Sequence, residues 1–216
     1  MIDITQARKE DIPRIVELFM SSFPDSIRHI FGDAKPNPIG LIDLFSFIYN
    51  CEPESAFVAK EQMEKGDIIG YIISPRSMRR LWFLAVIKGY IFKWFIRWVK
   101  GDYGLGLAQI KTLVKNKFGF VLTPYNYTHT TDAQILSIAV AQEMRGKGIG
   151  SLLLEQAMKY LNHIGVQQIK LEVRPENVSA RRMYKNFGFI EEGTTRDSQG
   201  EWIVMMYRKK ENRKGG

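Results

Sequence analysis

The chain has 216 residues, of which 45% are hydrophobic and 25% charged, a composition typical of a folded protein with its own core. A single cysteine, Cys51, excludes an intramolecular disulfide framework and suits a reducing compartment. The formal net charge is +8, but the basicity is local: between Ile68 and Thr131 ten lysines and arginines are accompanied by one acid, Asp102.

The N-terminal segment carries acids where a secretory signal would need a basic stretch followed by an apolar one. No uncharged apolar stretch reaches the length of a membrane span. The three histidines and Cys51 are scattered without metal-ligand spacing, so we expect no metal site. These features favour a cytoplasmic protein and leave contact with a membrane surface open.

The N-terminal third predicts two helices and three strands. Residues 2–7 alternate like a strand, and Asp11 is a candidate N-cap for a first helix. A second helix is expected over 41–49. The segments 56–60 and 67–74 are expected to form a hairpin.

The basic segment 75–131 is rich in aromatic residues. On a helix beginning near Gly89, Lys93, Arg97 and Lys100 fall on one side, and Tyr90, Ile91, Trp94, Phe95 and Trp98 cover much of the rest. This pattern suits a helix lying on an anionic membrane surface. It also suits a helical hairpin that packs on the sheet or on a second copy through residues 78–100, with solvated cations.

No RNA-binding motif accompanies the basic segment, so no nucleic-acid partner is expected. Near its end, Tyr125, Tyr127 and His129 are candidates for shaping a substrate pocket.

The last third alternates strands and helices. Strands are expected over 134–140 and 168–173, helices over 150–164 and 177–186, and a final hairpin over 189–195 and 202–208. The unit 134–173 should be a right-handed parallel crossover. The order of elements predicts an α+β (α/β-like) fold with a mixed sheet.

The loop between the first of these strands and its helix is rich in glycine and cations. It contains Arg145, Gly146, Lys147, Gly148, Ile149 and Gly150. Glycines permit positive φ and close approach of a ligand, and the following helix offers its positive dipole end, so the loop is typical of a phosphate site. The Lys-Ser/Thr of a Walker loop is absent. A dinucleotide site, with Glu172 at a suitable distance, would need the glycines directly after the strand. A plain glycine turn remains the simplest alternative.

Residues 145–150 fit the signature R/Q-x-x-G-x-G/A, and a second motif follows in Leu171–Phe189, which contains Asn177, Tyr184 and Gly188-Phe189. Both motifs resemble the GNAT acetyltransferase superfamily, most closely the branch of the ribosomal-protein alanine acetyltransferases. The resemblance covers residues 133–208 strongly. It implies a single GNAT domain over 1–216, with a mixed sheet of about six to seven strands, in which 75–131 is an unmatched helical insertion.

The resemblance implies acetyl-CoA as co-substrate and an amine acceptor, which could be a small molecule, an amino sugar or a peptide amine. It implies that Ile138, Ala139 and Val140 hold the pantetheine arm and thioester. Loop amides over 145–150, with Ser151, would hold the pyrophosphate.

The resemblance also implies that Tyr184 is the general acid for the leaving thiolate and that Asn177, first a helix cap, touches CoA. Glu172 is the candidate base, because it points away from its apolar neighbours near the carboxyl end of its strand. Simpler interpretations are a tyrosine at the core edge and a solvated strand charge beside Lys170. A water relay could replace Glu172.

Two other functions stay open. One is an acyl-CoA-binding module without catalysis. The other is an interaction protein that docks to a membrane or a ribosome through the basic insertion.

Overall fold

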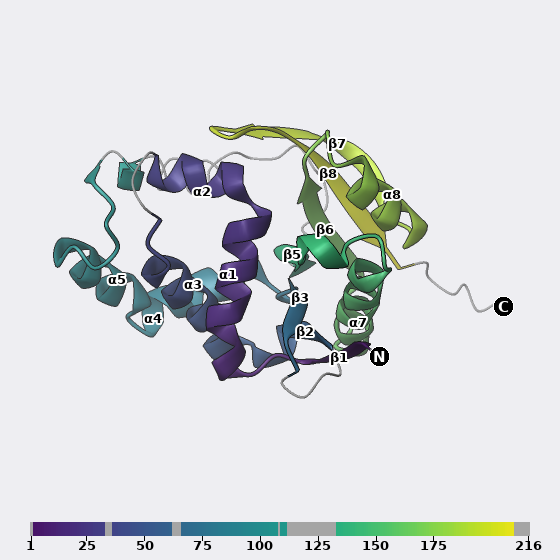
Figure 1. Cartoon of the computed structure of the whole chain (residues 1–216), viewed down its shortest axis with the longest axis horizontal. Coiled ribbons are helices and arrows are strands. Elements are labelled where there is room, and N and C mark those ends of the chain that lie inside the picture. The colour runs from purple at the N-terminus through teal and green to yellow at the C-terminus, as the bar shows by residue number, and fades with distance from the viewer. Residues whose placement is uncertain (1, 33–35, 62–65, 108, 112–132, 210–216) are drawn as a thin grey trace, which may run out of the picture.

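The computed structural model describes residues 2–32, 36–61, 66–107, 109–111 and 133–209, which contain two four-stranded sheets (Figure 1). The first sheet has the order β1-β2-β3-β5, and all its neighbours are antiparallel. Its strands are β1 (Ile2–Gln6), β2 (Ala56–Glu61), β3 (Ile68–Ile73) and β5 (Ser137–Val140). The predicted hairpin of 56–60 and 67–74 is therefore confirmed.

The second sheet has the order β4-β6-β8-β7. Its strands are β4 (Ala133–Gln134), β6 (Gln168–Val173), β8 (Gly200–Arg208) and β7 (Ile190–Asp197). β4 is parallel to β6, and the remaining pairs are antiparallel. The predicted α+β class with mixed strand pairing is confirmed, and the strands are shared between two sheets.

The prediction of one continuous strand over 134–140 was wrong. Ile135 donates its backbone N–H to Lys170 in the second sheet, and Leu136 donates to Ile73 in the first. The chain therefore changes sheets between two consecutive residues. The parallel crossover exists, but it joins only the short β4 to β6 through α7 (Ile149–His163).

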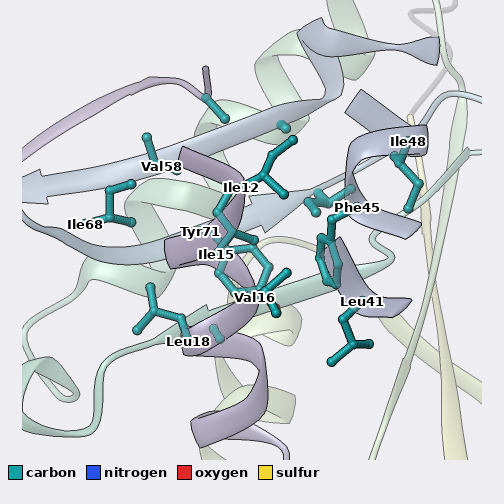
Figure 2. Close-up of a cluster of buried hydrophobic side chains, with 14 of the residues drawn as sticks. Ile12, Ile15, Val16, Leu18, Leu41, Phe45, Ile48, Val58, Ile68 and Tyr71 are labelled. Atoms are coloured by element: carbon teal, nitrogen blue, oxygen red, sulfur yellow. The ribbon is translucent and has the colours of Figure 1, made fainter. Parts of the chain in front are cut away.

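One face of the first sheet is covered by α1 (Ile12–Ser22) and α3 (Ile39–Cys51) (Figure 1). Both helices repeat apolar residues at helical spacing, so each presents one apolar face to the strands. Figure 2 shows Ile15 and Val16 of α1 facing Phe45 of α3 and Tyr71 of β3, and all four are buried in one cluster.

The opposite face of this sheet is covered by α7. Leu153, Leu154 and Leu161 are fully buried in a second cluster that includes Ile72 of β3 and Leu171 of β6. Truncating a leucine in such a setting costs about 2–5 kcal/mol. Because its leucines pack on strands of both sheets, α7 stabilises the position of one sheet against the other.

Two local features differ from expectation near the N-terminus. A helix that the sequence did not predict, α2 (Pro24–Phe31), follows α1 directly. Asp11 precedes α1 but makes no side-chain cap bond. Its carboxylate instead accepts the backbone N–H of Arg8 at 2.8 Å and lies 3.1 Å from the Lys60 ammonium.

The basic segment forms a helical hairpin of α4 (Met78–Ile87) and α5 (Tyr90–Val99). The hairpin packs on α3: the Phe47 ring lies 4.8 Å from Tyr90 and 5.2 Å from Trp94. Arg97 is not a solvated cation, because it binds Asp43 and Asp102 at 2.6–2.9 Å. Tyr125, Tyr127 and His129 lie outside the described residues. In the part of the chain described above, no helix is long and apolar enough to cross a membrane.

Candidate active site

The two sheets separate where the chain leaves β4, and a gap opens between β5 and β6. The hydrogen bond of 2.9 Å between the Ile135 N–H and the Lys170 carbonyl is the last one between the β4–β5 segment and β6 among the described residues. Beyond it β5 pairs only with β3, while β6 pairs with β8 on its other edge. The facing edges of β5 and β6 therefore have no strand between them in the described structure.

The backbone of β5 directs alternate residues into this gap. Ala141 donates to Ile69 at 2.8 Å, which fixes the phase of the antiparallel pair. Ala139 lies in the same phase, so its backbone groups face β3. Those of Ile138 and Val140 face the gap. Of the three residues predicted to hold a pantetheine arm, two thus offer hydrogen-bonding groups and Ala139 does not.

The loop after β5 ends in a row of free amides. Gly146 and Gly148 have φ of 78° and 80°, a conformation that side chains with a Cβ rarely adopt. Within the described residues, no backbone N–H from Gly146 to Gly150 has a hydrogen-bond acceptor. Ser151 differs, because its N–H donates to the Gly148 carbonyl at 3.0 Å. The row leads into the N-terminus of α7, so these N–H groups and the helix dipole form an anion site.

Cations flank the amides. Both Arg145 and Lys147 are exposed. The Arg145 Nε donates to the Val140 carbonyl at 3.1 Å, and the Lys147 ammonium contacts the Met144 sulfur at 3.3 Å. Neither side chain has an ion-pair partner in the described chain, so both can receive an anion.

Gly150 brings the loop, β5 and α8 (Val178–Asn186) into contact. A Cβ at Gly150 would lie 3.3 Å from the Met183 sulfur and 4.0 Å from Val140 Cγ2. A side chain at position 150 would require the Met183 side chain to shift by a few tenths of an ångström. The glycine therefore allows the Met183 side chain of α8 to pack closely on the start of α7.

Asn177 and Tyr184 lie on α8, and their environments differ. Asn177 is exposed, and its side chain caps the helix by accepting the Ala180 N–H at 3.1 Å, as predicted. Tyr184 is 5% exposed and packs beside Phe189. Burial raises the pKa of its phenol above the ordinary value. Within the described chain its hydroxyl has no hydrogen-bond partner, so the phenol keeps its proton and can donate it.

Glu172 lies on β6, on the face opposite to the core. Ile169, Leu171 and Val173 are buried, and the intervening Lys170 and Glu172 are not, which confirms the expected alternation. The Lys170 ammonium lies 2.8 Å from the Glu172 carboxylate. Glu172 is therefore an ion-paired strand residue at the edge of the gap.

Sequence reasoning missed the contacts of α2 with the turn between β7 and β8. Ser26 donates to Gln199 at 2.7 Å, and His29 lies 2.7 Å from the Ser198 hydroxyl. The partners are about 170 residues apart in the sequence, and no local pattern joins them. Arg145 likewise approaches Ser22 of α1, at 3.5 Å.

Comparison with known proteins gives a consistent result. The model of the acetyltransferase (GNAT) family matches residues 12–189. An N-alpha-acetyltransferase of Sulfurisphaera tokodaii is 26% identical over 190 residues, which are 87% of this chain and 80% of that protein. The [ribosomal protein bS18]-alanine N-acetyltransferase of Salmonella typhimurium is 26% identical over 56% of this chain and 79% of its own length.

Other similarities are partial or structural. An uncharacterized N-acetyltransferase of Methanocaldococcus jannaschii is 39% identical over 87 residues, and the chain spans 56% of its length. The crystal structure of SsHAT superposes with a TM-score of 0.69 at 19% identity, covering 97% of this chain and 99% of that one, which shows a shared fold. Because the family model spans most of the chain and agrees with the two motifs, this chain belongs to the acetyltransferase (GNAT) family.

Proposed function

We propose that this chain transfers the acetyl group of acetyl-CoA to a primary amine by direct attack on the thioester. The observation that carries the proposal is the gap between β5 and β6, which ends at five backbone N–H groups, from Gly146 in the loop to Gly150 in the first turn of α7, that have no acceptor among the described residues. An extended amide-bearing arm needs a strand edge, and a pyrophosphate needs an anion site. The two lie next to each other here. We also propose that residues 1–216 form one domain and that 75–131 is an insertion in it.

Acetyl-CoA supplies an activated acetyl group as a thioester. In this proposal Ile138 and Val140 hold the pantetheine arm through their backbone groups, beside Ala139. The amides over 146–150 hold the pyrophosphate, with charge from Arg145 and Lys147, and Ser151 contributes its hydroxyl. The Val140 N–H would stabilise the carbonyl oxygen as it gains negative charge. Asn177, the N-cap of α8, would contact the CoA moiety.

Tyr184 is proposed as the general acid. When the amine forms its bond to the acetyl carbon, the carbon–sulfur bond breaks and the sulfur leaves with a negative charge. A thiol leaves more easily if it receives a proton. The phenol of Tyr184 is protonated at neutral pH, because the ordinary pKa of tyrosine is about 10 and burial raises it further. Water passes the second proton of the attacking nitrogen to the phenolate, so that the nitrogen becomes a neutral amide and the phenol is restored.

Glu172 is proposed as the base that takes a proton from the acceptor ammonium, directly or through one water. An ammonium has no lone pair, so this proton must leave before attack. The ion pair with Lys170 fixes the carboxylate on the face of β6 away from the core.

For the acceptor we propose the amine of a peptide, ahead of a small amine or an amino sugar. The support is the naming of relatives: one is called an N-alpha-acetyltransferase and another acts, by its name, on an alanine of a ribosomal protein.

The direct test is an acceptor screen that follows release of free thiol from acetyl-CoA. Peptides with a free α-amine, the same peptides with a blocked α-amine, polyamines and amino sugars form the panel. We expect thiol release with free α-amines alone. Binding of acetyl-CoA with no release for any acceptor would favour the non-catalytic acyl-CoA-binding module.

A further inference from the structure

The hairpin of α4 and α5 has an outward surface made of large apolar side chains. We call it the hairpin face. Each member is between 56% and 68% exposed. They are Phe83, Val86 and Ile87 on α4 and Phe92, Phe95 and Val99 on α5. The two helices contact each other and lie at the edge of the molecule away from the second sheet (Figure 1).

The fold does not need these side chains, because the hairpin is anchored by its other side. Leu81 and Ala85 of α4 are buried. Tyr90 and Trp94 of α5 pack on the ring of Phe47, which belongs to α3. Arg97 adds the ion pairs to α3 and to the loop after α5. α5 therefore has two apolar sides. The side with Tyr90 and Trp94 packs on α3, and the side with Phe92, Phe95 and Val99 is exposed to water. An exposed apolar surface of this kind marks an interaction site.

The charged residues of the hairpin itself are all positive. No aspartate or glutamate occurs from residue 68 to 101. Lys88, Lys93 and Lys100 are exposed, and none has an ion-pair partner within the described residues. Lys88 lies in the turn between the helices, and Lys93 and Lys100 share one edge of α5 because seven residues separate them.

We infer that the hairpin face docks on a membrane surface rich in anionic phospholipid. Each helix has ten residues and is about 15 Å long, half the thickness of the hydrocarbon layer, so the helices lie in the interface. Phenylalanines enter the acyl boundary, and lysines bind lipid phosphates. This docking is independent of the acetyl transfer proposed above.

A second copy of the chain fits this surface less well. A two-fold interface places the same patch on both subunits. Both copies would then bring the same bordering lysines to the interface, with no acid of the hairpin to compensate them. Anionic headgroups supply the missing charge.

Cosedimentation of the full chain with vesicles tests the inference. We expect binding to vesicles of phosphatidylglycerol and phosphatidylcholine, and at least roughly tenfold weaker binding to phosphatidylcholine alone. The double variant Phe83→Glu/Phe92→Glu should lose about 100-fold or more in partition coefficient, since two buried rings are lost. Both positions are exposed, so the fold is retained, which circular dichroism checks. Ile190→Glu, at a position 64% exposed on β7, is the apolar control and should bind like wild type.

Two triple variants that remove the same net charge distinguish the effect of lysines at the hairpin face from the effect of the net charge of the protein. Replacing Lys88, Lys93 and Lys100 by Gln should weaken binding roughly 100-fold, whereas Lys9, Lys159 and Lys209 to Gln should change it little. Equal losses, or wild-type binding by the Phe83→Glu/Phe92→Glu variant, would overturn the inference. It would also be overturned by a wild-type dimer that ignores vesicles and dissociates in the Phe83→Glu/Phe92→Glu variant.

Discussion

The backbone N–H of Ile135 donates to the carbonyl of Lys170 at 2.9 Å, and the next residue, Leu136, donates to Ile73 in the other sheet. This pair of bonds sets the point at which β5 and β6 separate. Everything proposed for the active site depends on it, because a continuous sheet would pair the backbone of Ile138 and Val140 with β6. No strand edge would then be free to hold an extended arm.

The first prediction concerns the general acid. Tyr184→Phe should lower kcat about 100-fold, since the leaving sulfur loses its proton donor, with little change in acetyl-CoA binding. Steady-state kinetics and calorimetric titration measure the two effects. Tyr207→Phe is the control, because Tyr207 also packs on Phe189 but is not proposed to reach the thioester. If both variants keep wild-type kcat, Tyr184 is a core residue only.

The second prediction concerns the base. Glu172→Gln should lower kcat/KM about 100-fold near neutral pH, because the amide cannot accept the ammonium proton. The deficit should shrink as pH rises, because more of the acceptor amine is then already neutral. Lys170→Gln breaks the same ion pair and should have a much smaller effect. A pH-independent loss that Lys170→Gln shares would mean that the ion pair is structural.

A third prediction links two buried tyrosines to stability at high pH. Burial raises the pKa of Tyr71 and of Tyr184. Their contribution to the free energy of unfolding is therefore complete below the pKa of free tyrosine, about 10, and is lost as pH rises above it. Each should contribute a slope of about 1.4 kcal/mol per pH unit in that range. Denaturant unfolding across this range measures the slope. Tyr184→Phe should reduce it by the contribution of one tyrosine. An unchanged slope in that variant would contradict the assignment.

The strand β6 and the helix α8 were predictable because their sequence patterns are local. The alternation of Ile169, Leu171 and Val173 placed Glu172 on the opposite face, and Asn177 caps its helix through a bond to a residue three positions on. The glycine loop was predictable for the same reason, since a positive φ at Gly146 and Gly148 depends mainly on residue type.

The break at Ile135 was not predictable, because residues 134–140 are apolar enough for one strand and the division depends on partners far away in sequence. The phase of Ala139 follows from the same partners. α2 was missed because its ends are set by contacts with α1 and with the distant β7–β8 turn. One of the two ion pairs of Arg97 likewise needs Asp43, which lies 54 residues earlier.

The anion site tests the central claim, and the chain offers a matched pair of glycines for it. Gly148, with φ of 80°, precedes α7, and Gly165, with φ of 83°, follows it; a Cβ at either would meet no atom within 4 Å. A glutamate introduces the same backbone strain and the same charge at both positions. Only at Gly148 does it lie beside the free amides.

The decisive measurement is calorimetric titration of CoA into the wild type, Gly148→Glu and Gly165→Glu. The proposed site predicts that Gly148→Glu loses roughly 100-fold or more in affinity while Gly165→Glu binds CoA like the wild type. Wild-type affinity in Gly148→Glu would contradict the assignment of the CoA site to this loop.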